Sequence, residues 1–303
     1  MADPLRAPPA DRSPAELLAF GVVNLDKPAG PSAHQVAGWV RDLAADAAND
    51  FSPEGPTVDR AAHAGTLDPK VTGCLPLLLG DATRMAQVFL EGRKEYVAVL
   101  ELHGPAPTTL EPVLAEFEAP LYQKPPRKSA VSRRLRVREI HDLELLDSTD
   151  RQALIRIQCE SGTYVRKLCH DLGLALGTGA HMGHLRRTAT DPFDDTTLVT
   201  LQSFTDALEF AREGDEVPLR EIVQPAERAL THLPRVEIAP SAAREVATGA
   251  PVYAPGVISA DDADDGALVA CYTPDGSAVC LGTMAGDPDA DSGTVVDLER
   301  VLV

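Results

Sequence analysis

A turn-rich segment that leads directly into an apolar run constrains this chain more than any other feature. The segment spans residues 63–73 and reads HAGTLDPKVTG, and the apolar run LPLLL follows at 75–79. Pro69 disfavours helical backbone at Asp68, and a glycine on either side permits tight backbone paths. The apolar run is typical of a buried strand. The pattern therefore predicts one carboxylate, Asp68, held in a rigid turn beside the core, although Asp-Pro is also common in plain surface turns.

The rest of the chain has the patterning of an α+β protein. At 303 residues it can bury a sizeable core and hold one large domain or two. Ser13, Ser32 and Thr163 are candidate N-caps, and Gly177 is expected to end the helix that begins after Thr163. We expect helices over 14–20, 33–43, 82–90, 163–176, 201–212 and 218–231, strands over 21–25, 75–79, 96–102, 154–159, 267–272 and 278–283, a flexible lead over 1–13 and a loop over 44–60.

Cysteine usage and apolar runs limit the class of protein. The five cysteines form no CxxC pair, and free buried thiols are usual in such apolar segments, so we expect a reducing cytoplasm and no structural zinc. His181 and His184 have a spacing that a metal could use, but no third ligand is evident nearby. No run is long enough to span a bilayer, and residues 1–14 lack the apolar stretch of a signal peptide.

Acidic residues give the chain a formal net charge of −18. Residues 201–303 carry nineteen acids against six arginines and no lysine, and the whole chain has only six lysines. This composition predicts a protein kept soluble in high salt; the alternative is an acidic tail region in an ordinary protein.

Residues 121–140 depart from the acidic trend, with seven basic side chains and one acid. A local basic patch can attract RNA even on an acidic protein, because salt screens the distant charges. We expect Lys128, Arg133 and Arg134 to contact RNA. The partial alternation of arginines from 133 to 138 is typical of a strand edge that follows phosphates.

Four segments, in the same order, resemble the TruB family of pseudouridine synthases: GVVNLDKP at 21–28, HAGTLDPKVTG at 63–73, KEY at 94–96 and SGTYVR at 161–166. Three further blocks are most similar to the archaeal dyskerin branch, which provides the catalytic subunit of the H/ACA guide-RNA particle: KPPRKSAV at 124–131, GAHM at 179–182 and LRRT at 185–188. The resemblance implies an N-terminal extension (1–20), a mixed-sheet pseudouridine synthase catalytic domain (21–232) and a small β-rich, RNA-binding PUA domain (233–303).

The resemblance implies an enzyme that isomerises uridine in RNA to pseudouridine. The reaction breaks the N1–C1′ bond, rotates the freed base and rejoins it through C5, so neither a redox cofactor nor a metal is expected. It requires an ionised carboxylate at the sugar, a cation beside that carboxylate, a surface for the base and a group that removes a proton. The target nucleotide must also leave its stack.

Three residues match the catalytic positions of the family. Asp68 is the expected carboxylate, which can stabilise or attack an oxocarbenium-like centre. Arg166 is expected to keep Asp68 ionised and oriented. Tyr96 is expected to stack on the base, and its hydroxyl could take part in proton removal. Without the resemblance, Arg166 would suggest a surface helix and Tyr96 a half-buried strand.

Three more residues are assigned by resemblance. His63 resembles a histidine that helps to displace the target nucleotide, Lys27 resembles a brace for the active-site loop, and Leu185 resembles an apolar residue that lines the pocket.

The chain differs from the usual pattern of the family at three places. His184 stands where close relatives usually carry Glu, ATDP at 189–192 replaces a more basic RSGP pattern, and Ala62 replaces a usual Gly. These departures put RNA contacts near 184–191 in question, but they leave the catalytic residues intact.

Three functions remain open from the sequence. The leading hypothesis is a guide-RNA-directed synthase acting on rRNA, with guide RNA and small accessory proteins of the H/ACA particle as partners and with no membrane or DNA partner. The second is a stand-alone synthase that modifies the T-loop uridine of tRNA. The third is a non-catalytic RNA-binding scaffold. The block at 124–131 and the PUA-like tail favour the first hypothesis, and the intact catalytic residues argue against the third.

Overall fold

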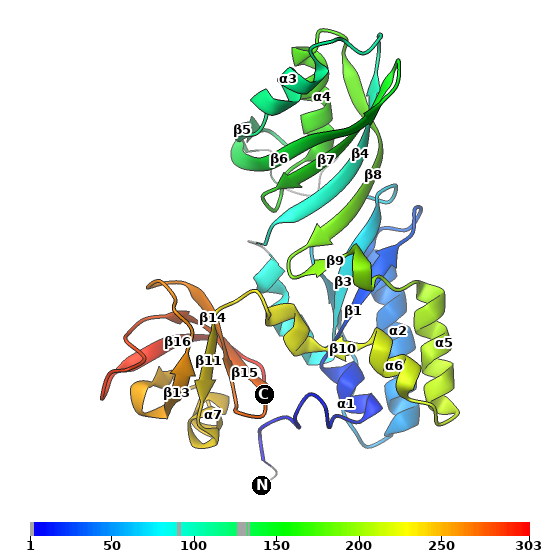
Figure 1. The fold of residues 1–303 in the computed structure, drawn as a ribbon. Helices are drawn as coiled ribbons and strands as arrows, with labels where there is room; N and C mark the ends of the chain where they lie inside the picture. Colours follow the sequence, from blue (N-terminus) through cyan, green and yellow to red (C-terminus); the bar gives the residue numbers. More distant parts are fainter. Residues whose placement is uncertain (1–2, 90–91, 126–131, 133) are drawn as a thin grey trace.

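The computed structural model describes residues 3–89, 92–125, 132 and 134–303, and its strands form two separate sheets (Figure 1). Up to residue 159 the elements are α1 (Pro14–Ala19), β1 (Gly21–Lys27), α2 (Ala33–Phe51), β2 (Ala61–His63), β3 (Thr72–Leu79), the 3₁₀ helix η1 (Gly80–Phe89), β4 (Lys94–Leu102), α3 (Leu110–Glu116), β5 (Pro120–Gln123), β6 (Arg136–Ser148) and β7 (Gln152–Cys159). The middle of the chain adds α4 (Val165–Ala175), β8 (Ala180–Thr190), β9 (Phe193–Asp194), η2 (Asp195–Thr197), α5 (Leu201–Arg212), α6 (Val217–Ile222), β10 (Gln224–Pro225) and η3 (Ala226–Leu230). The remainder forms β11 (Arg235–Ile238), α7 (Pro240–Ala247), β12 (Val252–Tyr253), η4 (Ala254–Gly256), β13 (Val257–Ala260), β14 (Leu268–Tyr272), β15 (Ala278–Met284) and β16 (Thr294–Val301).

Both sheets are mixed, which confirms the predicted α+β class. The larger sheet has the strand order β10-β1-β3-β8-β4-β7-β6-β5, with β2 on β3 and β9 on β8, and only β3 and β8 run parallel within it. The smaller sheet has the order β12-β16-β15-β14-β11-β13, with β11 and β14 parallel. The parallel pair β3–β8 brings together two segments more than a hundred residues apart, and the strands next to it carry the predicted site.

Two groups of helices cover opposite ends of the larger sheet (Figure 1). Around β1 and β3, the helices α2, α5 and α6 bury Val36, Val40, Phe204 and Leu219. At the other end, α3 and α4 pack on β4, β6 and β7. Burial of each large apolar side chain contributes about 1.5–3 kcal/mol, so these two apolar clusters stabilise the packing of the helices on the sheet.

Several sequence expectations are confirmed in detail, but the predicted extents of three helices are wrong. Ser13 and Ser32 both cap helices through complete capping boxes, as predicted. However, α2 does not end at residue 43 but continues to Phe51, so the predicted loop is restricted to 52–60. The extension is rich in alanine, a strong helix former, and its inward-facing alanines are fully buried.

Two further helices differ from the prediction, one in the residue that caps its start and one because it is interrupted. The N-cap of α4 is Tyr164, because the Thr163 hydroxyl instead donates to the Glu160 carbonyl. The helix expected over 218–231 is interrupted at Gln224 and Pro225, which pair with β1 as strand β10. Proline has no N–H to continue a helix, so the chain restarts as the short η3.

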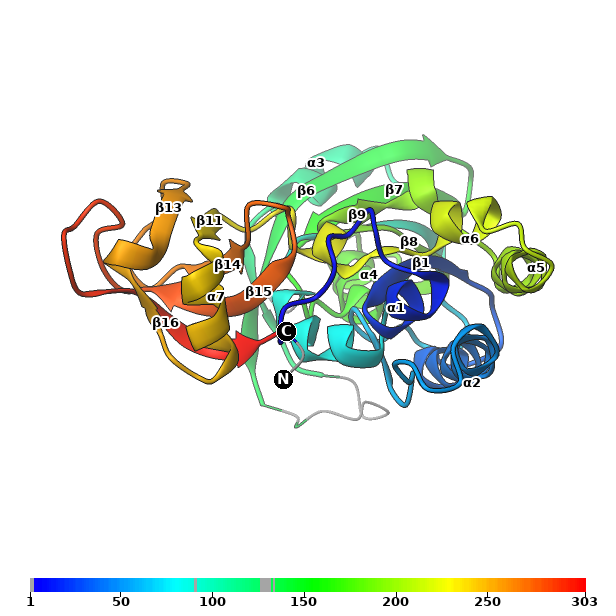
Figure 2. The same cartoon turned by 90° about the horizontal axis from the view of Figure 1, so that it is seen from below.

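The N-terminal segment is packed rather than flexible, contrary to expectation. It runs between the two sheets when the molecule is seen from below (Figure 2). The Arg12 guanidinium is buried and makes paired hydrogen bonds of 2.8 and 2.6 Å to Glu227 of η3. The same carboxylate accepts a hydrogen bond from the backbone N–H of Ala278 in β15. The buried Arg12–Glu227 ion pair therefore connects the N-terminal segment to η3 and, through the same carboxylate, to β15 of the smaller sheet.

The remaining expectations concern thiols and membrane spans. All five cysteines are free and buried, as predicted. No helix in the described part of the chain is long and apolar enough to cross a membrane.

Candidate active site

Asp68 lies in the connection between β2 and β3, in the turn that the sequence predicted. The backbone N–H of Val71 donates to the Asp68 carbonyl at 3.0 Å, which closes the turn. Both flanking glycines have positive φ, +88° at Gly65 and +97° at Gly73, so the backbone takes paths that other residues rarely adopt. The turn is therefore shaped by local residues on both sides of the carboxylate.

Lys27 stabilises this turn through hydrogen bonds to backbone carbonyl groups. Its ammonium group is fully buried and donates to the carbonyls of Pro28, Pro69 and Val71 at 2.9, 3.2 and 2.9 Å. Burial lowers the pKa of Lys27, and the negative charge of Asp68 opposes that change. These contacts are those of a brace for the active-site loop, the position that the resemblance implies for Lys27.

Arg166 meets Asp68 from the first turn of α4. Its Nη2 atom lies 2.9 Å from Oδ2 of Asp68, with side chains that are 36% and 46% exposed. The buried Gln123 side chain holds the start of α4 in place, since it accepts from the Tyr164 N–H at 2.8 Å and donates to the Tyr164 carbonyl at 3.5 Å. The fold thus delivers the predicted carboxylate and cation to each other across almost a hundred residues of sequence.

Tyr96 and Leu185 lie on the adjacent strands β4 and β8. Both side chains are partly buried, and both pack against the two apolar clusters of the large sheet. Burial raises the pKa of Tyr96, while the nearby positive charge of Arg187 opposes that rise. The ring of Tyr96 is therefore positioned by packing, and its cross-strand neighbour on β8 is Arg187.

His63 is the last residue of strand β2 and lies close to the Arg187 guanidinium. Its Nδ1 atom is buried and has no hydrogen-bond partner among the described residues. Burial, and then the positive charges of Arg187 and His34, lower the pKa of His63. The imidazole is therefore neutral near pH 7, which suits an insertion next to a nucleotide better than it suits ion pairing.

Two buried cations at this site were not assigned from the sequence. Lys94 is 3% exposed and donates to the Phe89 carbonyl at 3.0 Å, and burial, followed by the charge of Arg187, lowers its pKa to about 8. Arg187 is 1% exposed and contacts three different parts of the site. The one available signal was its position, two residues after Leu185 on the same face of a strand.

The predicted RNA-contact residues fall only partly within the described chain. Lys128 and Arg133 lie outside the described residues. Arg134 is exposed just before β6, which begins at Arg136 and pairs with β5 there. Arg138 is engaged by Glu160, with Nη1 2.6 Å from the carboxylate.

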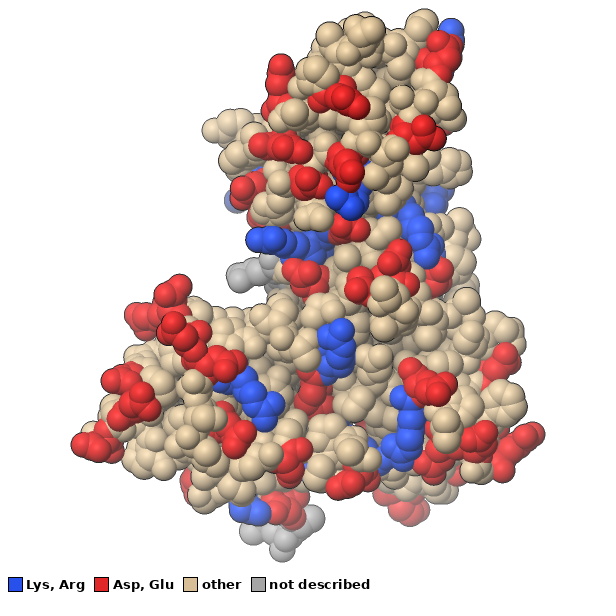
Figure 3. Space-filling model, viewed as in Figure 1, with Lys and Arg blue, Asp and Glu red and all other residues tan. Residues whose placement is uncertain are grey.

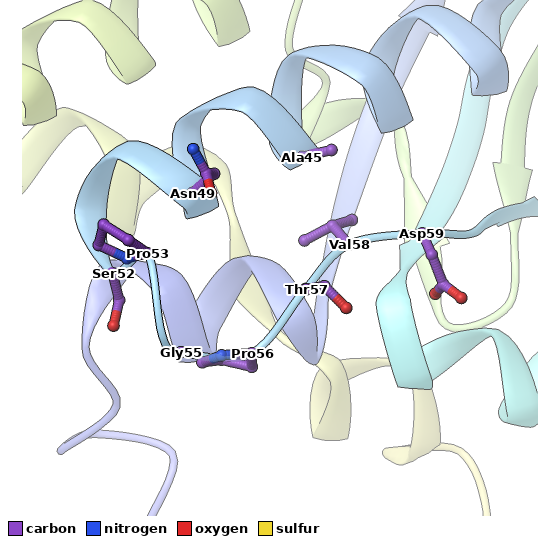
Figure 4. A pocket seen from close by; sticks show the side chains of 9 residues that line it. All are labelled: Ala45, Asn49, Ser52, Pro53, Gly55, Pro56, Thr57, Val58 and Asp59. Atoms are coloured by element: carbon purple, nitrogen blue, oxygen red, sulfur yellow. The ribbon is translucent and has the colours of Figure 1, made fainter.

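Other candidate sites receive little support. The described residues contain no group of three or more histidine, cysteine, aspartate or glutamate side chains that could hold a metal. His181 instead contacts His103, with ring nitrogens 3.0 Å apart. A cavity of about 270 Å³ between α2 and the following segment (Figure 4) includes none of the predicted site residues; it is lined by Ala45, Asn49, Ser52, Pro53, Gly55, Pro56, Thr57, Val58 and Asp59.

Four families match consecutive parts of the chain. Residues 5–37 match the DKCLD (NUC011) domain, and 55–165 match the TruB family pseudouridylate synthase N-terminal domain. Residues 166–231 match the tRNA pseudouridylate synthase B C-terminal domain, and 234–302 match the PUA domain.

Relatives match the chain over almost all of its length. Proteins called "Probable tRNA pseudouridine synthase B" from Haloarcula marismortui and Halobacterium salinarum are each 63% identical to it, over 99% of this chain and 94% and 99% of their own. The protein of that name from Pyrococcus abyssi is 42% identical over 97% of this chain and 87% of its own.

Solved structures share the complete fold. A chain in the crystal structure of a Cbf5–Nop10–Gar1 complex superposes with a TM-score of 0.89 at 40% identity, covering 99% of this chain and 90% of that one. A chain in an H/ACA RNP bound to a substrate RNA containing 2′-deoxyuridine gives 0.88 at 38% identity, covering 100% and 91%. On this evidence the chain belongs to the TruB family of pseudouridine synthases, with a DKCLD domain before its catalytic part and a PUA domain after it.

Proposed function

We propose that the chain isomerises uridine to pseudouridine in rRNA under the direction of guide RNA, as the catalytic subunit of an H/ACA particle in the cytoplasm. The observation that carries the catalytic part is the 2.9 Å contact between Asp68 and Arg166 in a turn braced by Lys27. The likeness over the full chain to Cbf5-containing complexes supports the guided form and small accessory proteins as partners. The residue roles and the domain limits 1–20, 21–232 and 233–303 belong to the same proposal.

The chemistry assigns one task to each side chain. The Asp68 carboxylate acts at C1′ of the uridine while the N1–C1′ bond breaks, and Arg166 keeps that carboxylate oriented. The freed base rotates against the Tyr96 ring and the Leu185 side chain. A C1′–C5 bond then forms, C5 loses its proton and N1 gains one, so the product has the same atoms as the substrate. His63 helps to displace the target nucleotide from its stack.

A second candidate is a stand-alone enzyme that acts on the T-loop uridine of tRNA. The names of the 63% identical relatives favour it, since they are called tRNA pseudouridine synthases. A two-substrate assay separates the candidates. Uridine tritiated at C5 releases tritium when the C5–H bond breaks, so tRNA and an rRNA fragment with its guide RNA can be compared, each with and without the accessory proteins.

The guided proposal expects tritium release from the rRNA fragment only when guide RNA and accessory proteins are present. Efficient release from tRNA by the protein alone, with none from guided rRNA, would establish the stand-alone reading instead. RNA binding without release from either substrate would leave a scaffold and overturn both.

The catalytic role of Asp68 has a direct test. Asp68→Asn keeps the size and hydrogen bonding of the side chain but removes its charge, so we expect no detectable turnover while RNA affinity stays within about threefold of wild type. Asp59→Asn is a matched control, because Asp59 is an exposed carboxylate in the connection before β2, where it pairs with its neighbour Arg60. Substantial turnover by a verified Asp68→Asn preparation would overturn the assignment.

A further inference from the structure

Arg187 is a buried arginine at the centre of the active-site framework. It lies on β8, opposite Gly73 of the parallel strand β3 and opposite Tyr96 of the antiparallel strand β4. Its side chain is 1% exposed, although arginine is among the residues most rarely buried. The sequence places it in the LRRT block without giving it any chemical task.

The guanidinium joins three separate pieces of the site. Its Nε atom donates to the Cys74 carbonyl at 2.7 Å, and Nη2 donates to the Gly65 carbonyl at 3.3 Å. Arg187 is also the direct cross-strand neighbour of Tyr96, and its positive charge opposes the rise in the pKa of that residue. Gly65 begins the turn that carries Asp68, so one planar group spans the strand of the tyrosine and the turn of the carboxylate.

The charge of Arg187 is not neutralised by any described carboxylate. Buried charges are normally paired, because an isolated one costs several kcal/mol of solvation. None of the nineteen ion pairs between described residues includes Arg187; its hydrogen bonds go to two carbonyls, and Tyr96 is its cross-strand neighbour. Its positive charge acts on two neighbouring basic side chains, since it contributes to the lowered pKa values of His63 and Lys94.

We propose that Arg187 is a positioning residue for the isomerisation: it fixes the Tyr96 hydroxyl relative to the Asp68 turn and supplies an unpaired positive charge beside that hydroxyl. The inference rests on the roles proposed above for Asp68 and Tyr96. An unpaired buried cation stabilises negative charge that develops next to it during a reaction. Negative charge develops on the uracil when N1 leaves C1′, and the phenol oxygen must carry negative charge before Tyr96 can accept the C5 proton.

A lysine could not replace this arrangement. The guanidinium presents several N–H groups in a rigid plane, which lets it bind two carbonyls in different directions at once. An ammonium on a flexible stem keeps the charge but not this geometry. A packing role alone would make no use of either property, and this difference makes the proposal testable.

The first test is a double-mutant cycle. Arg187→Met in the wild-type background is expected to lower kcat by about tenfold or more while KM for RNA changes less than about threefold. In a Tyr96→Phe background, which lacks the hydroxyl, the same change should cost less than about threefold, because the contact is already gone. Arg156→Met is the matched control: it removes a half-exposed guanidinium from the same sheet, where Arg156 pairs with Glu144. Equal losses in both backgrounds, or a loss confined to KM, would overturn the proposal.

The second test does not depend on activity. Difluorotyrosine incorporated at position 96 ionises near neutral pH, and its phenolate can be followed by absorbance as pH is varied. Removal of the neighbouring positive charge should raise the midpoint by about 0.5 pH unit or more in Arg187→Met, and leave it unchanged in Arg156→Met. Arg187→Lys serves if the methionine variant does not fold, and it should lower kcat without the full spectral shift. An unshifted midpoint in a folded Arg187→Met protein refutes the contact, whereas a shift without any effect on kcat refutes the positioning role proposed for Arg187.

Discussion

Three buried polar side chains hold the backbone around Asp68 and Arg166. Lys27 donates to carbonyls of the Asp68 turn, Gln123 binds the backbone where α4 begins, and Arg187 donates to the carbonyls of Gly65 and Cys74. Each uses main-chain groups as partners, so the site depends on backbone placement more than on neighbouring charges. Residues that touch RNA can therefore vary at the surface while the catalytic geometry stays the same.

Tyr96 has two separable properties at the residue scale, a ring and a hydroxyl. Tyr96→Phe keeps the ring, whereas Tyr96→Ala removes both, and the stacking surface for the base goes with it. If the hydroxyl takes part in proton removal, both variants should lose about a hundredfold or more in kcat. Single-turnover rates measured with saturating RNA decide this. A phenylalanine variant close to wild type would assign proton removal to another group.

Buried thiols should make the protein less stable in alkali. Burial raises the pKa of Cys74, Cys159 and Cys169 from 9.0 to about 12, so stability present below pH 9 is lost as pH rises towards 12. Lys94 acts in the opposite direction between about pH 8 and 10.5, because its pKa is lowered in the folded state. The free energy of unfolding should therefore fall above pH 9.

The contribution of one thiol to this pH dependence of the unfolding free energy can be measured by substituting a single cysteine. Each thiol contributes up to about 1.4 kcal/mol per pH unit in this range, so Cys169→Ala should make the fall shallower by about that amount. Urea unfolding under reducing conditions at several pH values above 8 measures it. A slope that Cys169→Ala leaves unchanged would contradict the linkage.

At the scale of elements, the closest approach in the site lies between β3 and β8. A Cβ atom on Gly73 would lie 2.2 Å from the Arg187 carbonyl oxygen, and the residue has a φ of +97°. Gly30 has a similar φ of +116°, but a Cβ there would meet nothing within 4 Å. An alanine would have a strained backbone at both positions, but only at Gly73 would its Cβ atom also clash with the neighbouring strand.

This contrast predicts the effect of two alanine substitutions. Gly30→Ala should cost about 1–2 kcal/mol of unfolding free energy, from the strained backbone alone. Gly73→Ala should cost several-fold more and should lower kcat, because β3 must move away from β8 next to the Asp68 turn. Denaturant unfolding of both variants measures the difference, and equal costs would mean that the strands can separate without penalty.

At the scale of the whole molecule, arginine ion pairs hold the N-terminal segment, and two of them differ sharply in burial. Arg12 pairs with Glu227 inside the protein, with side chains 1% and 10% exposed, whereas Arg244 of α7 pairs with Asp3 at the surface. Removing one partner of a buried pair leaves an uncompensated charge. Arg12→Met should therefore cost about 3–5 kcal/mol, and Arg244→Met should cause little measurable change. Comparable losses in the two variants would show that Glu227 finds another partner or solvent.

Salt should act on the molecule as a whole. The net charge is −18, and acidic side chains predominate on the face shown in Figure 3. Salt screens their mutual repulsion, but it also weakens phosphate contacts with RNA. We expect stability and activity both to rise from dilute buffer towards molar salt, with activity passing through an optimum. Melting curves and rates at each salt concentration test this, and a protein most stable and most active in dilute buffer would contradict it.

The sequence alone determined the features that depend on nearby residues. The turn at Asp68, the caps at Ser13 and Ser32 and the strand β4 follow from short patterns, because turn chemistry and capping act over a few residues. The family resemblance added the roles of the candidate residues, the mixed-sheet catalytic domain and the PUA domain. Local patterns failed where packing competed with them, as in the extension of α2 over buried alanines and the break at Pro225.

Only the tertiary structure decided which distant residues meet. The contacts of Asp68 with Arg166, Gln123 with Tyr164 and Arg12 with Glu227 join segments about forty to more than two hundred residues apart. Arg187 has the same sequence context as its partly exposed neighbour Arg186, yet one is buried in the active-site framework and the other pairs with Asp26. The direction of a strand's side chains and the packing of its neighbours decide such differences, and both arise only when the sheet forms.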